Sequence, residues 1–176
     1  QTKEGGGMNA SFLLRFKAFI IDYILILIYL VCVFILSEFL FLSIQEFFTG
    51  SLIIAQFTGF LLVTFPVSLY FIISDSKIGE QSFGKRKTGI RVVGTNGEPL
   101  SILHLTFRTI LKFLPWELSH FLVYRLINIG EGEDVPFTLS LLGGLVYALM
   151  FAYILTAIFT KKKQALYDIV ARTQVV

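Results

Sequence analysis

The sequence contains little of what soluble proteins, disulfide frameworks and metal sites are built from. Its 176 residues include one cysteine, one tryptophan, two histidines and four prolines, and only 15% of them are charged. An ordinary soluble domain has roughly 25% charged residues, so this composition argues against a protein surrounded by water. The single cysteine, Cys32, excludes a disulfide or a cysteine-rich metal site within one chain.

Long apolar runs take the place of the missing charge. Hydrophobic residues make up 55% of the chain, and they are massed into runs at about residues 12–36, 52–74 and 139–159. Each run is close to the roughly 20 residues that cross a bilayer as a helix. The net charge is only +3, and the basic residues lie between the runs, which favours orientation in a lipid bilayer over binding of nucleic acid.

A fourth crossing is predicted from the charges of the loops. Residues 100–128 are apolar enough to cross the membrane or to lie along its surface, although they carry polar side chains and Pro115. Basic residues mark cytoplasmic loops. Three crossings would place the lysines at 161–163 outside, whereas a crossing by 100–128 places the acidic residues at 131–134 outside. We therefore expect an all-α bundle of four transmembrane helices in the cytoplasmic membrane, with both termini in the cytoplasm.

The remaining segments are short. Residues 1–7 are polar and rich in glycine, and we expect them to be a disordered leader or a remnant before one transmembrane domain over residues 8–176. Residues 89–97 predict a small cytoplasmic hairpin, because a strand-like run enters an Asn-Gly turn. Ser101 is expected to cap the third helix, and residues 161–176 to form a cytoplasmic tail.

Small residues recur along two of the predicted helices. In the last run, Gly144, Ala148 and Ala152 stand at every fourth position. Lipid offers no hydrophobic force between helices, so close contacts depend on such small residues. We expect this stripe to pack against the other helices, with Ala55 and Gly59 forming a shorter contact of the same kind on the second helix.

Charged side chains also lie within the apolar runs. Arg15 and Asp22 are on one face of the first helix, two turns apart. A carboxylate inside a membrane costs roughly a few kcal/mol unless it meets a partner, water or an ion, so Asp22 is a candidate functional residue. The third helix offers polar partners at His104, Arg108, Lys112, Glu117 and His120. Two interpretations remain open: Asp22 and Arg108 neutralise each other, or they take part in transport or ligand binding.

No catalytic or cofactor site is expected. Glu117 and His120 are three residues apart, which is half of a helical carboxylate–histidine metal motif, but the sequence has no second copy. A single zinc or iron site through His104 or His120 is the minor alternative. The sequence shows neither an ordered nucleophile arrangement nor a glycine-rich phosphate loop, so we predict no metal, no cofactor and no enzymatic activity.

Three segments carry motifs in a fixed order, and together they extend over nearly the whole chain. They are residues 15–22, 79–93 and 166–176. In this order they resemble the RDD family of bacterial membrane proteins. The family is named for an arginine and two aspartates, which the resemblance places on Arg15, Asp22 and Asp168. The glycine–lysine loop motif of the family corresponds to Gly79, Ser82, Gly84, Lys85 and Gly89.

The resemblance implies a small cation/proton exchanger or a transporter of an unidentified ligand. Asp22 would then exchange a proton or a cation. Asp168 is expected to dock against the basic loop at Lys85 or Arg91, or to cap a helix of the tail. The alternative is a non-transporting adaptor whose basic loop and tail bind a protein partner or anionic lipid. A transporter of this size is expected to need a homo-oligomer or a membrane-protein partner.

Overall fold

Most of the chain is helical. The computed structural model describes residues 9–40, 47, 50–130 and 132–176, so the expected leader at residues 1–7 lies outside the described residues. Two of the long helices contain π-helical segments, η1 and η2. In chain order the long elements are α1 (Phe12–Ile35) with η1 (Leu36–Leu40), α3 (Leu52–Gly59) with η2 (Phe60–Thr64) and α4 (Phe65–Ser74), α6 (Ile102–Leu126), and α7 (Phe137–Phe159).

Three of these helices are long and apolar enough to cross a membrane. They cover Phe12–Phe39, Leu52–Ser74 and Phe137–Phe159, in agreement with the three apolar runs. The fourth long helix, α6, has 25 residues and is therefore long enough, but four charged side chains lower its hydropathy. A crossing by α6 stays a prediction at this point.

Serine side chains define where three helices begin. The hydroxyl oxygens of Ser11, Ser51 and Ser101 each accept a hydrogen bond from the backbone N–H three residues later, at 3.2–3.3 Å. This contact satisfies one of the amide groups that a helix N-terminus leaves without a partner. The predicted cap at Ser101 is confirmed.

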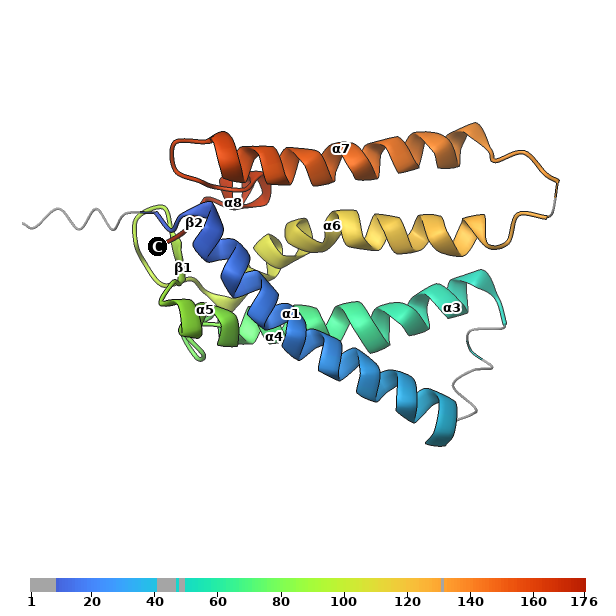
Figure 1. Cartoon of the computed structure of the whole chain (residues 1–176), viewed down its shortest axis with the longest axis horizontal. Helices are drawn as coiled ribbons and strands as arrows, with labels where there is room; N and C mark the ends of the chain where they lie inside the picture. The colour runs from blue at the N-terminus through green and yellow to red at the C-terminus, as the bar shows by residue number, and fades with distance from the viewer. Residues whose placement is uncertain (1–8, 41–46, 48–49, 131) are drawn as a thin grey trace, which may run out of the picture.

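The long helices lie side by side, with α6 in the middle (Figure 1). The combined helix α3–η2–α4 packs on one side of α6 and α7 packs on the other, while α1 crosses the bundle at an angle. On the α3 side the contact is close, because a Cβ added at Gly59 would meet the Tyr124 hydroxyl at 2.6 Å, and Ala55 is buried. The small-residue contact predicted for the second helix is confirmed.

The small-residue stripe of α7 does not pack as predicted. Gly144 and Ala148 are exposed, Ala152 is half-buried, and the buried side of the helix carries Val146 and Ala157. The physical reason is the helical repeat. At about 100° per residue, Gly144, Ala148 and Ala152 lie within about 80° of one another, and Val146 and Ala157 lie on the opposite side of the helix, which is the side that packs on the bundle.

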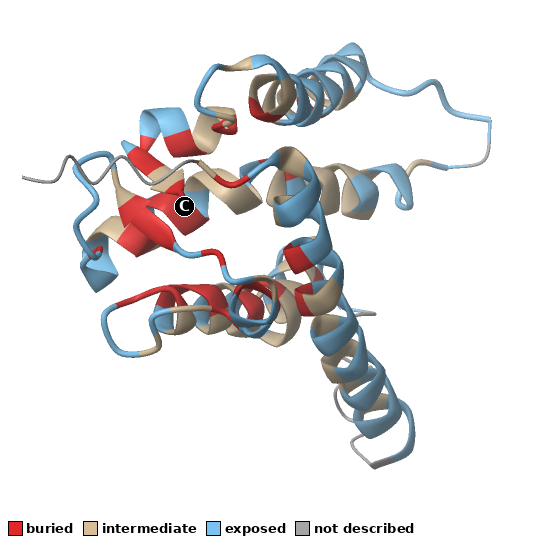
Figure 2. Cartoon of the chain, turned by 60° about the vertical axis from the view of Figure 1, so that its left-hand side comes forward, coloured by how far each residue is buried: buried red, intermediate tan, exposed pale blue. Residues whose placement is uncertain are grey.

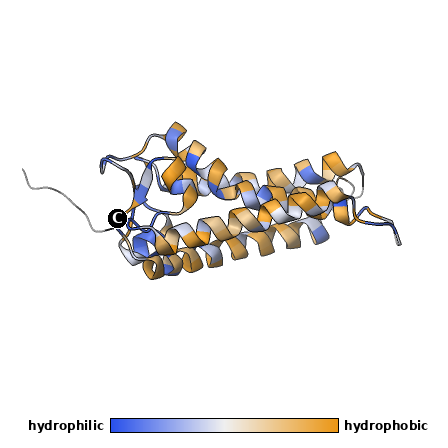
Figure 3. Ribbon diagram, turned by 90° about the horizontal axis from the view of Figure 1, so that it is seen from above, coloured by the Kyte–Doolittle hydropathy of each residue, from blue (hydrophilic) through white to orange (hydrophobic). Residues whose placement is uncertain are grey.

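Short elements form a layer at one end of the bundle. They are α5 (Phe83–Thr88), β1 (Val92–Gly94), α8 (Leu166–Val170) and β2 (Thr173–Val175). We call residues 75–100 and 160–176 the end layer. The helices α1 and α6 begin at this layer and α4 and α7 end at it, and the buried residues concentrate there (Figure 2). Polar residues gather at the same end (Figure 3).

The predicted hairpin at residues 89–97 is wrong in its strand pairing. The turn forms, with Gly97 at φ 80° and its N–H bonded to the Gly94 oxygen at 2.8 Å. The strand β1, however, pairs antiparallel with β2 from the C-terminus, with Val92 opposite Val175. After the turn, Pro99 has no N–H to donate and α6 begins three residues later, which leaves no room for a returning strand.

Candidate functional site

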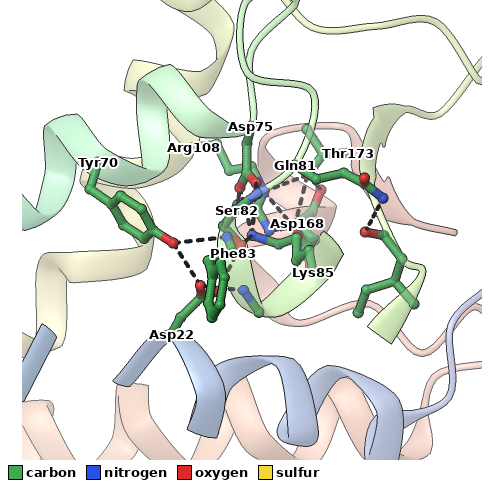
Figure 4. A network of polar contacts seen from close by, with 12 residues as sticks. Asp22, Tyr70, Asp75, Gln81, Ser82, Phe83, Lys85, Arg108, Asp168 and Thr173 are labelled. Atoms are coloured by element: carbon green, nitrogen blue, oxygen red, sulfur yellow. Dashed lines mark hydrogen bonds and ion pairs between the residues drawn. The ribbon is translucent and has the colours of Figure 1, made fainter. Parts of the chain in front are cut away.

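A network of buried charges lies where the end layer meets α1, α4 and α6 (Figure 4). All three of its carboxylates are almost completely buried, with exposed fractions of 2% for Asp22, 3% for Asp75 and 0% for Asp168. The sequence predicted two of them. Each carboxylate has a different set of partners, and these partners decide its role.

Asp22 anchors the start of α5 to α1. Its carboxylate accepts three hydrogen bonds, which come from the Ser82 hydroxyl at 2.7 Å, the Gly84 N–H at 2.7 Å and the Tyr70 hydroxyl at 2.8 Å. Among the described residues no basic side chain forms an ion pair with Asp22. The predicted neutralisation of Asp22 by Arg108 is therefore wrong, because the carboxylate is satisfied by helix N-terminal donors instead.

Tyr70 extends the same contact. Its hydroxyl donates to Asp22 and accepts from the backbone N–H of Phe83 at 2.9 Å. Asp22 and Tyr70 thus serve two consecutive amide groups in the first turn of α5. A helix of six residues is marginal by itself, so these contacts from α1 and α4 hold it in place.

The glycines of the loop motif allow the close packing around α5. A Cβ at Gly84 would lie 2.1 Å from the carbonyl oxygen of Ala18, so only glycine fits between α5 and α1. At Gly79 an added Cβ would meet the backbone of Ser74 at 2.6 Å. Gly89 ends α5 with φ 72°, a left-handed conformation that favours glycine.

Asp168 is the centre of a salt-bridge cluster. Two guanidinium nitrogens of Arg108 contact one of its oxygens at 2.8 Å, and Arg15 contacts the other at 3.3 Å. The Thr173 hydroxyl donates to the same carboxylate at 2.9 Å. The cluster therefore joins α1, α6, α8 and β2, which are far apart in the sequence.

Both predictions for the partner of Asp168 are wrong. Lys85 binds another carboxylate, and Arg91 is exposed, with its backbone paired to Val176. Asp168 does not cap the tail helix either, because Ala165 occupies the N-cap position of α8. The pairing of β1 with β2 turns Arg91 outward and draws α8 inward towards the start of α6.

Asp75 is a member of the network that the sequence analysis missed. Lys85 contacts its two oxygens at 2.7 and 2.9 Å, the Ser82 N–H donates at 3.2 Å, and Arg108 lies 4.0 Å away. Burial opposes ionisation of this carboxyl, but Lys85 and Arg108 outweigh it and keep the pKa of Asp75 below its usual value. One signal was available, because Asp75 is an acidic residue directly after the apolar run at residues 52–74.

A pH dependence of stability follows from Asp75. Its pKa is lower in the folded chain, so its contribution to stability is complete above the unfolded pKa and disappears as the pH falls through the folded pKa. We expect Asp75→Asn to be less stable than wild type near neutral pH, and to lose less stability on acidification from about pH 6 to about pH 3. Unfolding at both pH values in detergent, followed by Trp116 fluorescence, measures this difference. An equal loss in both proteins would contradict the assignment.

Tyr167 completes the buried side of the network. Burial raises the pKa of Tyr167 to about 12, and the neighbouring Asp168 adds to the rise, so the phenol is neutral. Its ring centroid lies 5.2 Å from the guanidinium carbon of Arg108. The aromatic face therefore covers the side of Arg108 that Asp168 does not contact.

The predicted polar side chains of α6 separate into three groups. His104 contacts the carbonyl oxygen of Ala171 in the end layer, and Arg108 belongs to the Asp168 cluster. Lys112 has no hydrogen bond or ion pair within the described ranges. Its nitrogen lies only against aromatic rings, 3.4 Å from the centroid of Phe71 and 5.3 Å from that of Phe113.

The third group lies further along α6. Glu117 and His120 form a pair with 3.6 Å between Oε1 and Nδ1, and the Thr64 hydroxyl donates to the same carboxylate. The Trp116 indole N–H donates to Thr64 at 3.2 Å. In the part of the chain that the structure describes, no three His, Cys, Asp or Glu side chains come together as metal ligands would. That the protein binds no metal stays a prediction.

Two cavities meet at Lys112. The first, which we call the polar cavity, has a volume of about 90 Å³. Its charged lining residues are Arg15, Asp22, Lys85, Arg108 and Lys112. The second, which we call the apolar cavity, has a volume of about 120 Å³ and extends from Lys112 to Thr64 and Trp116. Lys112 therefore stands between the charge network and the Glu117–His120 pair.

Comparison with known proteins identifies the family of the chain. No curated protein and no solved structure matches the chain. The model of the RDD family matches residues 9–172, which is nearly the whole chain. The matched region contains Arg15, Asp22 and Asp168. The chain therefore belongs to the RDD family.

Proposed function

We propose that the chain is a small ion exchanger with four membrane crossings, and that it couples the movement of protons to the movement of another ion. The helix α6 supplies the side chains that carry these ions. The main support for this proposal is the position of Lys112. A charged side chain within a membrane span is costly, and such residues are functional-site candidates by default. Lys112 lies between two cavities and has no partner of opposite charge among the described residues.

The arrangement of the long helices supports four crossings. All of them begin or end at the end layer, and α6 lies between two apolar helices along most of its 25 residues (Figure 1). If α6 crosses, the exposed basic side chains of the end layer fall on one side of the membrane, and Glu133 and Asp134 fall on the other. By the positive-inside rule, the end layer and both termini are then expected in the cytoplasm.

The carrier groups of this proposal differ from those that the sequence suggested. Asp22 accepts three hydrogen bonds from neutral donors, so protonating it or binding a cation there would release α5. Lys112, Glu117 and His120 lie deeper along α6 and make fewer contacts. The polar cavity, Lys112 and the apolar cavity lead from the end layer to Thr64, whose hydroxyl donates to Glu117, so we assign the moving charges to Lys112, Glu117 and His120.

Proton movement in vesicles tests the proposal. Vesicles that contain the purified protein and a pH-sensitive dye are given a gradient of sodium chloride. We expect wild type to change the internal pH, and Lys112→Met and Glu117→Gln to fall to the level of protein-free vesicles, because both changes remove a charge from the path. The matched control is Lys87→Met, since Lys87 is an exposed lysine of α5 and lies outside the path.

The outcomes separate the proposal from its rival. Wild type that behaves like protein-free vesicles would rule out the exchanger, and unchanged rates in both variants would rule out the path through Lys112 and Glu117. The rival is the adaptor, which is supported by the exposed basic side chains of the end layer. They include Arg86, Lys87, Arg91, Lys161, Lys162 and Arg172. Lys85 cannot take part in recruitment, because it is buried against Asp75. A partner protein, anionic lipid and a homo-oligomer stay predictions.

A further inference from the structure

We infer that the polar cavity binds a small inorganic anion and that Lys112 is the side chain that holds it. This inference rests on the proposed exchanger and names the class of ion that moves with the proton. The balance of charges around the cavity supports the inference, and a binding experiment that does not depend on transport tests it.

The charges around the polar cavity do not cancel. When Lys112 is protonated, four basic side chains and three carboxylates meet in the network, which leaves an excess of one positive charge. The basic side chains are Arg15, Lys85, Arg108 and Lys112, and the carboxylates are Asp22, Asp75 and Asp168. Burying an unbalanced charge is unfavourable, so a bound anion would complete the network.

Lys112 is the basic side chain of the cavity that has no hydrogen bond or ion pair among the described residues. The three donors of Lys85 are directed to both oxygens of Asp75 and to the Ser82 hydroxyl, at 2.7–3.1 Å. Arg108 contacts Asp168 twice, and Arg15 contacts Asp168 and backbone carbonyls. Lys112 has aromatic rings on one side and the cavity on the other. An aromatic face attracts the ammonium group but accepts no conventional hydrogen bond.

The carboxylate on the same cavity wall does not repel an anion strongly. Asp22 lines the cavity, but three hydrogen bonds from Ser82, Gly84 and Tyr70 stabilise its negative charge. Hydrogen bonds to a carboxylate disperse its charge and leave it a weaker partner for a further cation. This arrangement favours an anion next to Lys112 over a metal cation next to Asp22.

The size and depth of the cavity indicate a free ion. Its volume of about 90 Å³ gives room for a few water molecules, which suits a halide. Lys112 is ten residues beyond the start of α6, or about 15 Å along the helix axis. The phosphate of a lipid headgroup remains at the membrane surface, so we assign the site to a free monovalent anion.

Thermal unfolding in chloride tests the site. Purified protein is held in a neutral detergent without anionic lipid, and sodium gluconate is replaced by sodium chloride or sodium bromide at constant ionic strength. A ligand that binds only the folded chain stabilises it, so we expect the melting temperature of wild type to rise by several degrees. Lys112→Met should show no rise, and Lys87→Met should show the wild-type rise.

A second variant and a folding control keep the test decisive. Lys112→Arg retains the charge and is expected to keep part of the chloride effect. Lys112→Met removes a half-buried charge that has no ionic partner among the described residues, so in gluconate it should melt at or above the wild-type temperature. Equal melting temperatures of wild type in chloride and gluconate, or the same chloride effect in Lys112→Met, would overturn the inference.

The two proposals fail in different ways. Proton movement that requires Lys112 without any chloride effect on melting would leave the exchanger standing and remove the anion site. A chloride effect that depends on Lys112, in a protein that moves no protons, would leave the anion site standing and remove the exchanger. If only vesicles with anionic lipid, and not chloride, raised the melting temperature, the ligand would be a lipid headgroup and the inference would be wrong.

Discussion

Replacing Asp168 with asparagine is expected to lower the free energy of unfolding by about 3–5 kcal/mol. The side chain keeps its shape, but the negative charge that faces Arg15 and Arg108 is lost. Arg108 is itself almost completely buried and retains only the more distant Asp75 at 4.0 Å. Removing one partner of a buried ion pair costs more than the pair contributes, because an uncompensated charge remains in the interior.

Unfolding in mixed micelles with increasing amounts of a denaturing detergent measures this loss. Trp116 is the only tryptophan and lies on α6, so its fluorescence reports the state of the helix next to the network. The matched control is Asp134→Asn, which makes the same chemical change at an exposed position and should change stability by less than about 0.5 kcal/mol.

A double substitution identifies which charge matters. If Arg15 is destabilised by the loss of Asp168, then Arg15→Gln combined with Asp168→Asn should cost less than the two changes added together, by about 1–3 kcal/mol. Strict additivity would show that Arg15 does not depend on this carboxylate. Equal effects of Asp168→Asn and Asp134→Asn would contradict the central place of Asp168.

The long helices were predictable because their signals are local. A helix that crosses a bilayer must bring its own run of about 20 apolar residues, and a serine that caps a helix acts within four residues of its own position. For this reason the runs at residues 52–74 and 139–159, and the cap at Ser101, agree closely with the structure.

The partners of the charges were not predictable, because the pairing depends on tertiary structure. The sequence identified Arg15, Asp22 and Asp168 as special residues but offered several cations for each carboxylate. Arg15 and Asp168 are 153 residues apart, and tertiary contacts bring the tail next to the start of α1: β2 pairs with β1, and the Ala10 N–H donates to the Val175 oxygen at 2.9 Å. Spacing along one helix contains no information about this.

In the structure, the charges of the motif and Lys112 differ in their contacts. The charges of the motif hold the end layer on the helices: Asp22 holds α5, and Asp168 with Arg15 holds the tail. Lys112 lies outside the three motifs and has no ionic partner among the described residues, which makes it the stronger candidate for a moving charge or a bound ion. Its signal in the sequence was the spacing of four residues from Arg108, which places both on the same side of α6.

Replacing Gly84 with alanine is expected to lower the free energy of unfolding by about 3–5 kcal/mol, although the change adds a single methyl group. The new Cβ would lie 2.1 Å from the carbonyl oxygen of Ala18, which is backbone and cannot rotate away. The helix α5 must therefore move off α1, and the hydrogen bonds of Gly84 and Ser82 to Asp22 lengthen or break. Overpacking costs about 1–3 kcal/mol, and a hydrogen bond to a charged group contributes about 1.5–3 kcal/mol.

Two comparisons show whether the obstacle is the backbone of α1. Gly144→Ala places the same methyl group on α7, where nothing lies within 4 Å, so it should be neutral or slightly stabilising because alanine favours a helix. Ala18→Gly should fail to rescue Gly84→Ala, since the clash is with the carbonyl oxygen of Ala18 and not with its side chain. Unfolding in mixed micelles, followed by Trp116 fluorescence, ranks the three proteins. Two results would contradict the distance of 2.1 Å between the added Cβ and the Ala18 oxygen. One is rescue by Ala18→Gly, and the other is a Gly84→Ala protein as stable as Gly144→Ala.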